Sequence, residues 1–105
     1  MKAVRVQITR YLSDDPQPGI VECKLIDVWN REWTFVEKTA IVSSQYLDER
    51  TVYPQPGTIA CEITEIGQDG DGREIVTVNT AIPYWIEDVT GNSCFQVLPI
   101  QITDE

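Results

Sequence analysis

Apolar and polar residues alternate along several short stretches of this chain, and a period of two residues is typical of half-buried β-strands. The first stretch covers residues 4–9 and is followed by a turn signal, SDDP, at residues 13–16. Two further stretches, around residues 21–25 and 59–63, follow the same pattern. One face of each predicted strand should therefore lie against a common core. The apolar positions are Val4, Val6 and Ile8; Val21, Cys23 and Leu25; and Ile59, Cys61 and Ile63.

The second and third stretches are each introduced by the same four letters, PQPG, at residues 16–19 and 54–57. Proline fixes its own φ and favours an extended conformation of the residue before it, so the segment leading to the strand is expected to be extended. Glycine, which has few conformational restrictions, then allows the chain to turn into the strand. A turn follows in each copy, at residues 29–31 and 67–72, and both turns lead into Arg-Glu. We therefore predict one structural unit written twice, a β-hairpin. The residues of the second strands expected to point inward are Trp33, Phe35, Val76 and Val78.

The rest of the chain is predicted to add a third hairpin and one short helix. Residues 81–89 and 94–97 favour two strands joined around a Gly-Asn turn, and Pro99 makes the last apolar run an edge strand or a bulge. Residues 43–50 are the helical candidate, because a serine cap precedes leucine and acidic residues. The preceding residues 41–42 are expected to be extended.

These elements predict a single all-β domain spanning residues 1–105. We expect a small closed or partly open antiparallel barrel of about six to seven strands with one short helix, built from repeated hairpins. Closure is favoured because it removes the unpaired edges of short strands, and a β-sandwich is the alternative. The first strand, with Lys2, Arg5 and Arg10, is expected beside the acidic C-terminal part, and residues 103–105 are expected to form a solvated tail.

The chain carries 17 acidic and 8 basic residues, a net charge of −9. This balance repels polyanions, so we expect neither nucleic acid nor a membrane as partner. After Arg73 there are five acidic residues and no lysine or arginine. The excess charge is interpreted as a means of staying soluble or as an acidic face for a basic partner. An odd number of cysteines and no apolar leader favour a cytoplasmic location.

Few residues of this chain are suited to catalysis. There is no histidine, which excludes Ser-His-Asp and Cys-His arrangements. Cys23, Cys61 and Cys94 lack the close spacing of a zinc site, and Cys23 and Cys61 are interpreted as small buried hydrophobes or as a pair close enough to bond or to bind a soft metal. Residues 69–72 with Glu74 match a calcium loop poorly and favour a plain hairpin loop. We therefore predict no catalytic residue, no cofactor and no metal site.

The aromatic residues offer the best candidates for binding. Trp29, Asn30 and Arg31 lie at the first predicted hairpin turn, and Tyr84 and Trp85 follow a proline in the third hairpin. Trp, Tyr and Arg dominate the residues that contribute most to protein interfaces. Trp29 could instead fold back on the sheet. Of Tyr84 and Trp85, one is expected inside and one partly exposed, because adjacent residues of a strand point to opposite faces.

These observations favour a non-catalytic module for protein–protein interaction, an accessory protein whose partner is another protein or a second copy of itself. One alternative is a barrel that binds a small ligand or acts as an enzyme through carboxylates or a thiol. Another is an immunity-type inhibitor of a basic toxin.

Overall fold

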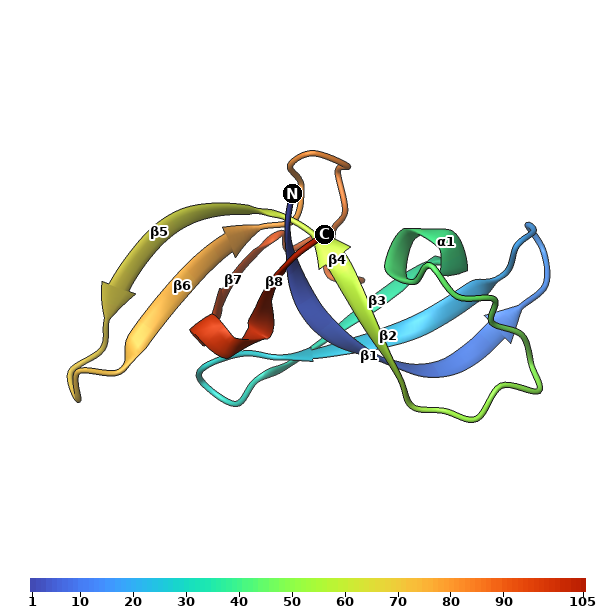
Figure 1. Cartoon of the computed structure of the whole chain (residues 1–105), viewed down its shortest axis with the longest axis horizontal. Helices are drawn as coiled ribbons and strands as arrows, with labels where there is room; N and C mark the ends of the chain where they lie inside the picture. The colour runs from blue at the N-terminus through green and yellow to red at the C-terminus, as the bar shows by residue number, and fades with distance from the viewer.

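A computed structural model describes the whole chain, Met1 to Glu105. The fold is all-β with one short α-helix, as predicted (Figure 1). In chain order the elements are β1 (Lys2–Ser13), β2 (Ile20–Ile26), β3 (Glu32–Lys38), α1 (Thr39–Val42), β4 (Gln55–Ala60), β5 (Glu62–Gln68), β6 (Glu74–Asn79), β7 (Cys94–Val97), the 3₁₀ helix η1 (Pro99–Gln101) and β8 (Ile102–Asp104).

The strands form two antiparallel sheets, and neither sheet closes on itself. The first has the order β3-β2-β1-β4, with β8 paired to the beginning of β1, and the second has the order β5-β6-β7. β4 and β5 follow each other directly in the chain and are separated only by Cys61, where the chain passes from the first sheet to the second. The Cys61 N–H donates to the Lys2 carbonyl at 3.0 Å. Figure 1 shows the β5–β6 hairpin as an arm that extends from the first sheet, and the molecule measures 44 × 25 × 25 Å.

The core lies between the two sheets, where 16 buried residues form one cluster. The alternation of apolar residues predicted this core well. Of the expected inward positions, Trp33 and Ile63 are only partly buried and pack against the cluster. The remaining expected positions are buried: Val4, Val6, Ile8, Val21, Cys23, Leu25, Phe35, Ile59, Cys61, Val76 and Val78.

The first predicted hairpin is present, with Leu25 opposite Trp33 in the β2–β3 pair. The second hairpin is formed by β5 and β6, but its first strand is shorter than predicted. Ile59 belongs to β4 and lies opposite Val4 of β1. The apolar alternation continues across the bend at Cys61, so the sequence pattern gives no sign that the chain changes its pairing partner there.

The two PQPG segments do not introduce the same unit, so this prediction was wrong. Residues 16–19 form a turn closed by a bond from the Gly19 N–H to the Pro16 carbonyl at 2.9 Å. Residues 55–57 lie within β4, where Pro56 is opposite Gln7. Four residues with the same preferences adopt different structures because only the second copy has a neighbouring strand to pair with.

The third predicted hairpin is also wrong. β7 pairs with β6, and residues 81–89 form turns and irregular structure instead of a strand. The Asp88 carboxylate accepts bonds from the backbone N–H groups of Thr90 and Asn92 at 2.9 and 2.8 Å. This local hydrogen bonding offers the backbone an alternative to strand pairing.

The helix begins earlier than predicted, because α1 contains residues 41–42, which were expected to be extended, and residues 43–50 are not helical. Pro99 starts the helix η1 and does not form an edge strand or a bulge. The expected tail is also wrong for Thr103 and Asp104, which are part of β8 and pair with β1. The predicted attraction between the two ends is present, since the Lys2 ammonium lies 3.0 Å from the Asp104 carboxylate.

Candidate functional site

The predicted binding residues lie in two separate places. Trp29, Asn30 and Arg31 occupy the turn between β2 and β3, whereas Tyr84 and Trp85 belong to the connection between β6 and β7. Figure 1 shows these two segments on opposite sides of the molecule. They therefore do not form one site.

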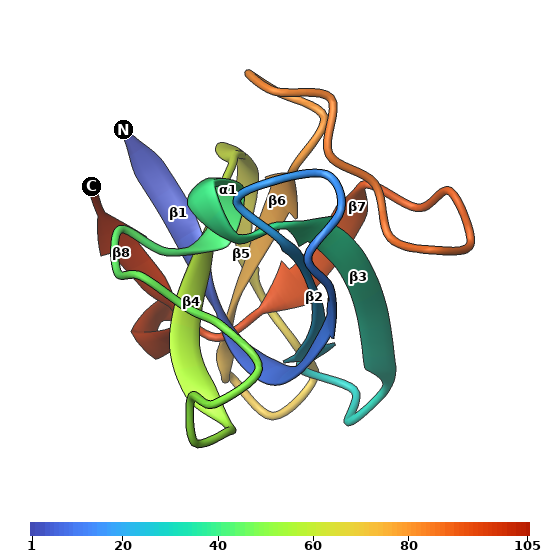
Figure 2. The same ribbon diagram turned by 90° about the vertical axis from the view of Figure 1, so that its right-hand side faces the viewer.

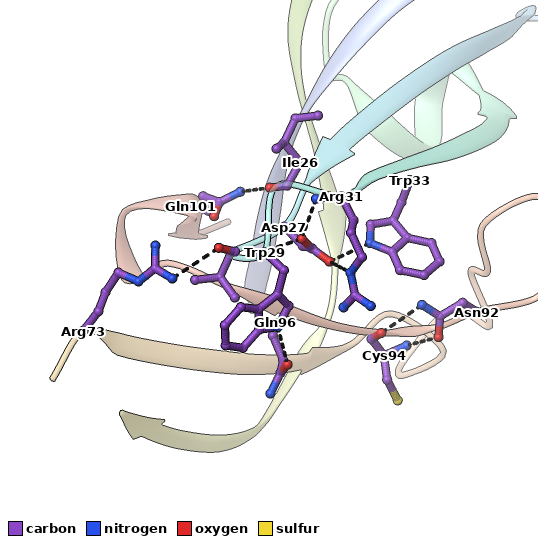
Figure 3. Close-up of polar contacts among 11 residues, drawn as sticks. Ile26, Asp27, Trp29, Arg31, Trp33, Arg73, Asn92, Cys94, Gln96 and Gln101 are labelled. Carbon is purple, nitrogen blue, oxygen red and sulfur yellow. Dashed lines mark hydrogen bonds and ion pairs between the residues drawn. The ribbon is translucent and has the colours of Figure 1, made fainter. Parts of the chain in front are cut away.

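The β2–β3 turn is organised around the buried Asp27 carboxylate (Figure 3). This carboxylate accepts bonds from the Trp29 and Arg31 backbone N–H groups, the Arg31 Nε and the Trp33 Nε1, each at 2.9 Å. Burial opposes ionisation of Asp27, but these bonds outweigh it and hold the pKa of the carboxyl below its usual value. Asn30 has the left-handed φ of 64° that the turn requires. Asn30 and Arg31 thus serve the turn itself.

Trp29 lies against the second sheet. Its Nε1 donates to the Gln96 Oε1 at 2.7 Å, and the neighbouring Val28 N–H donates to the Gln96 carbonyl at 2.8 Å. Arg73 donates to the Val28 carbonyl at 3.3 Å. Trp29 therefore folds back on the sheet, although 46% of the residue remains exposed. Its main structural effect is to join the β2–β3 turn to β7.

The same turn occurs twice more, at residues 69–73 and 88–92. In each copy the aspartate carboxylate accepts bonds from the backbone N–H groups two and four positions later. The aspartate N–H donates to the carbonyl four positions later. An Asp followed three positions later by Asn or Gly is the sequence signal for these turns, and apolar periodicity does not reveal it. In each of these three turns the residue at that position has a positive φ: Asn30 (64°), Gly72 (80°) and Gly91 (88°).

The second candidate is the loop that follows β6, and both of its ends are held tightly. The buried Thr80 hydroxyl donates to the Ile86 carbonyl at 2.7 Å, and the Ile86 N–H donates to the Thr80 carbonyl at 3.1 Å. The Trp85 N–H donates to the Ala81 carbonyl at 2.8 Å. The Ala81 N–H in turn donates to the Asn79 side chain at 2.9 Å. These bonds fix the loop as a short projection from the sheet, visible at the top of Figures 1 and 2.

The tip of this loop is apolar and exposed. Tyr84 is 59% exposed and Trp85 is 82% exposed, so the expectation that one of them lies inside was wrong. Ile86 is the buried residue of this loop, since residues 81–84 form turns and the strand alternation no longer applies. Trp85 also has a φ of 58°, which costs a bulky residue of the order of 1–3 kcal/mol. Such strain is concentrated at functional sites in proteins.

Tyr84 borders a groove that the sequence did not predict. The groove has a volume of about 430 Å³ and runs between α1 and the segment after it, the strand β4 and the beginning of β1. Arg5 contributes an exposed guanidinium that makes no ion pair. The residues that line the groove come from segments far apart in the sequence, so no local motif indicates it. The other polar side chains of the lining include Ser43, Ser44, Gln45 and Thr58.

The cysteines do not form a reactive centre. Burial raises the pKa of the Cys23 thiol to about 12 and that of Cys61 to about 11, so both thiols stay protonated at neutral pH. All three cysteines are free, and Cys94 is exposed. No group of three or more Cys, Asp or Glu side chains is placed to hold a metal ion.

None of the helices is both long and apolar enough to cross a membrane. Comparisons with protein families, with curated proteins and with solved structures find no match for this chain.

Proposed function

We propose that this chain is a non-catalytic protein-binding module, and that the loop from Ile82 to Trp85 contacts the partner. The observation that carries this proposal is the display of Trp85, a residue that is 82% exposed on a loop whose ends are fixed. Exposed aromatic residues on a rigid support lose little conformational entropy when they are buried in an interface. Tyr84 and Ile82 enlarge the same apolar tip.

The two sheets act as one partly open barrel that carries the loop, and the protein works in the cytoplasm on another protein or on a second copy of itself. A basic toxin is one form of such a partner, and the net charge of −9 supports it. A small ligand is the second candidate, because the volume of the groove is within the usual range for ligand sites.

A capture experiment with matched variants tests the proposal. Immobilised protein is exposed to a lysate of its own host, and the bound proteins are quantified for the wild type, the double variant Tyr84→Ser/Trp85→Ser and Tyr46→Ser. Tyr46 is a suitable control because it is also 82% exposed and makes no side-chain hydrogen bond. We expect one partner, bound in stoichiometric amount, that the double variant loses and the control retains. Equal capture by all three proteins would contradict the proposal.

A further inference from the structure

The outer edge of β4 carries backbone groups without a partner. Because the Cys61 N–H bonds directly to the Lys2 carbonyl opposite it, every second pair of the β1–β4 ladder is hydrogen-bonded. The pairs between them, which include Arg5 with Thr58 and the pair formed by Ala60, are not hydrogen-bonded. The N–H and C=O groups of Thr58 and Ala60 therefore point away from β1.

No other strand pairs with β4, and no turn or side chain bonds to these groups. Pro56 also belongs to a non-hydrogen-bonded pair, opposite Gln7. Its missing N–H therefore faces the free edge, where proline is tolerated. A strand added at this edge can make two bonds with Thr58, two with Ala60 and one with the Pro56 carbonyl.

The groove lies along this edge. Its lining contains Pro56, Gly57, Thr58 and Ala60 on one side, and α1 with the residues that follow it on the other. Figure 2 shows α1 beside β4. The other free strand edges are less suited to adding a strand. The Thr34 carbonyl of β3 already accepts a bond from the Val89 N–H, and β5 lies on the projecting arm.

Arg5 gives the groove a preference for charge. Five of the eight basic side chains form ion pairs, although acidic residues outnumber basic ones by 17 to 8. Arg5 is among the three that do not, and it lies opposite Thr58 on the outer face of the sheet. The other charged side chain of the lining is Glu105, whose N–H bonds to the Met1 carbonyl. A carboxylate on the segment that occupies the groove would be the natural partner of the Arg5 guanidinium.

We propose that the partner contributes an extended peptide segment that joins the sheet as a strand beside β4, with an acidic residue opposite Thr58 that pairs with the Arg5 guanidinium across β4. This inference rests on the proposed function and specifies how the partner is held. Main-chain bonds to Thr58 and Ala60 supply the affinity, and Arg5 selects a segment with a carboxylate. Tyr84, on the rim of the same groove, connects the added strand with the exposed loop.

The test uses a synthetic nonapeptide of alternating valine and threonine with one glutamate at its centre, acetylated and amidated at its ends. It is titrated into the intact protein, and backbone amide signals are followed by NMR together with their hydrogen exchange. We expect shifts and protection at the Thr58 and Ala60 amides. The same peptide with a central lysine should bind up to about fivefold more weakly, since an exposed ion pair contributes at most about 1 kcal/mol.

Two variants make the result specific. Thr58→Pro removes an N–H that β1 does not use and fixes φ, as Pro56 already does at the equivalent position of the same strand, so the variant should fold and lose peptide binding. Arg5→Glu should reverse the preference toward the lysine peptide, whereas the control Arg50→Glu, which alters an unpaired cation outside the groove, should not. A backbone N-methylated glutamate peptide should fail to bind the wild type.

Three results would overturn the inference: no change at Thr58 and Ala60 with millimolar peptide, unchanged binding by Thr58→Pro, or protection of these amides by self-association without peptide. The capture experiment with Tyr84→Ser/Trp85→Ser does not depend on any of them. If capture needs the loop while the peptide does not bind, the protein-binding function stands and only strand addition fails.

Discussion

The carboxylate of Asp27 organises the residues around it because it is ionised, buried and surrounded by donors. Asn is nearly isosteric but neutral, and its amide cannot accept from the Arg31 and Trp33 side chains as well as from the backbone. We therefore expect Asp27→Asn to lower the free energy of unfolding by about 2 kcal/mol in urea at neutral pH. Asp69→Asn is the control, since Asp69 has no tryptophan donor, and a loss as large there would contradict the explanation.

This difference should depend on pH. The pKa of Asp27 is lowered in the folded protein, so its contribution is complete above the ordinary pKa of aspartate and is lost as the pH falls through the lowered value. The stability of the wild type and that of Asp27→Asn should therefore converge in acid. A gap that stays constant to the lowest measurable pH would show that the carboxylate does not act through its charge.

The pKa of Glu37, on β3 of the first sheet, is shifted in the direction opposite to that of Asp27. Glu37 lies half-buried on β3 and makes no hydrogen bond or ion pair, and burial raises the pKa of its carboxyl. Stability therefore falls as the pH rises from the ordinary glutamate pKa through the raised folded value. We expect Glu37→Gln to raise the urea midpoint at pH 7 and to have a smaller effect at pH 4. The exposed Glu62→Gln on β5 is the control, because the Glu62 carboxylate forms no ion pair, and an equal gain there would contradict the prediction.

At the scale of elements, α1 is tied to β4 at Gly57. A Cβ added to Gly57 would lie 2.8 Å from the Ile8 Cγ1 and 3.0 Å from the Val42 carbonyl oxygen. We expect Gly57→Ala to lower the free energy of unfolding by about 1–3 kcal/mol, because the core and the end of α1 must both move. Gly67→Ala in β5 is the matched control, since nothing lies within 4 Å of its added Cβ. Denaturation in urea measures both, and equal losses would contradict the packing argument.

The elements that the sequence predicted are those set by near neighbours. The β2–β3 hairpin has short-range pairing and a turn whose Asn30 supplies the positive φ, so pattern and turn chemistry identify it together. The connection from Thr80 to Ile86 looked like a strand because it is apolar. Its structure depends on the hydroxyl of a buried threonine and on a tryptophan with positive φ, and neither follows from alternation. The groove beside β4 was missed because its lining comes from segments that are far apart in the sequence.

At the scale of the whole molecule, the two open sheets share one set of aromatic contacts. The Phe95 ring of β7 lies 5.4 Å from that of Trp33 and 5.5 Å from that of Phe35, so a residue of the second sheet fills the core of the first. The Val28 N–H bond to Gln96 joins the same two sheets at their surface. The sheets should therefore unfold together, even though the β5–β6 arm extends away from the core (Figure 1).

Phe95→Leu tests this coupling. Replacing the ring with a smaller side chain removes both aromatic contacts and leaves a cavity, and we expect a loss of about 1–3 kcal/mol in the free energy of unfolding. Urea unfolding is followed by NMR, in which the indole N–H signal of Trp33 reports the first sheet and the amide signals of β6 report the second. Both transitions should shift by the same amount and remain coincident. Ile66→Ala is the control, because Ile66 is 62% exposed on the arm and should change neither transition. If the β6 signals were lost at lower urea than the Trp33 signal, the second sheet would be a separate folding unit and the shared core would not hold the molecule together.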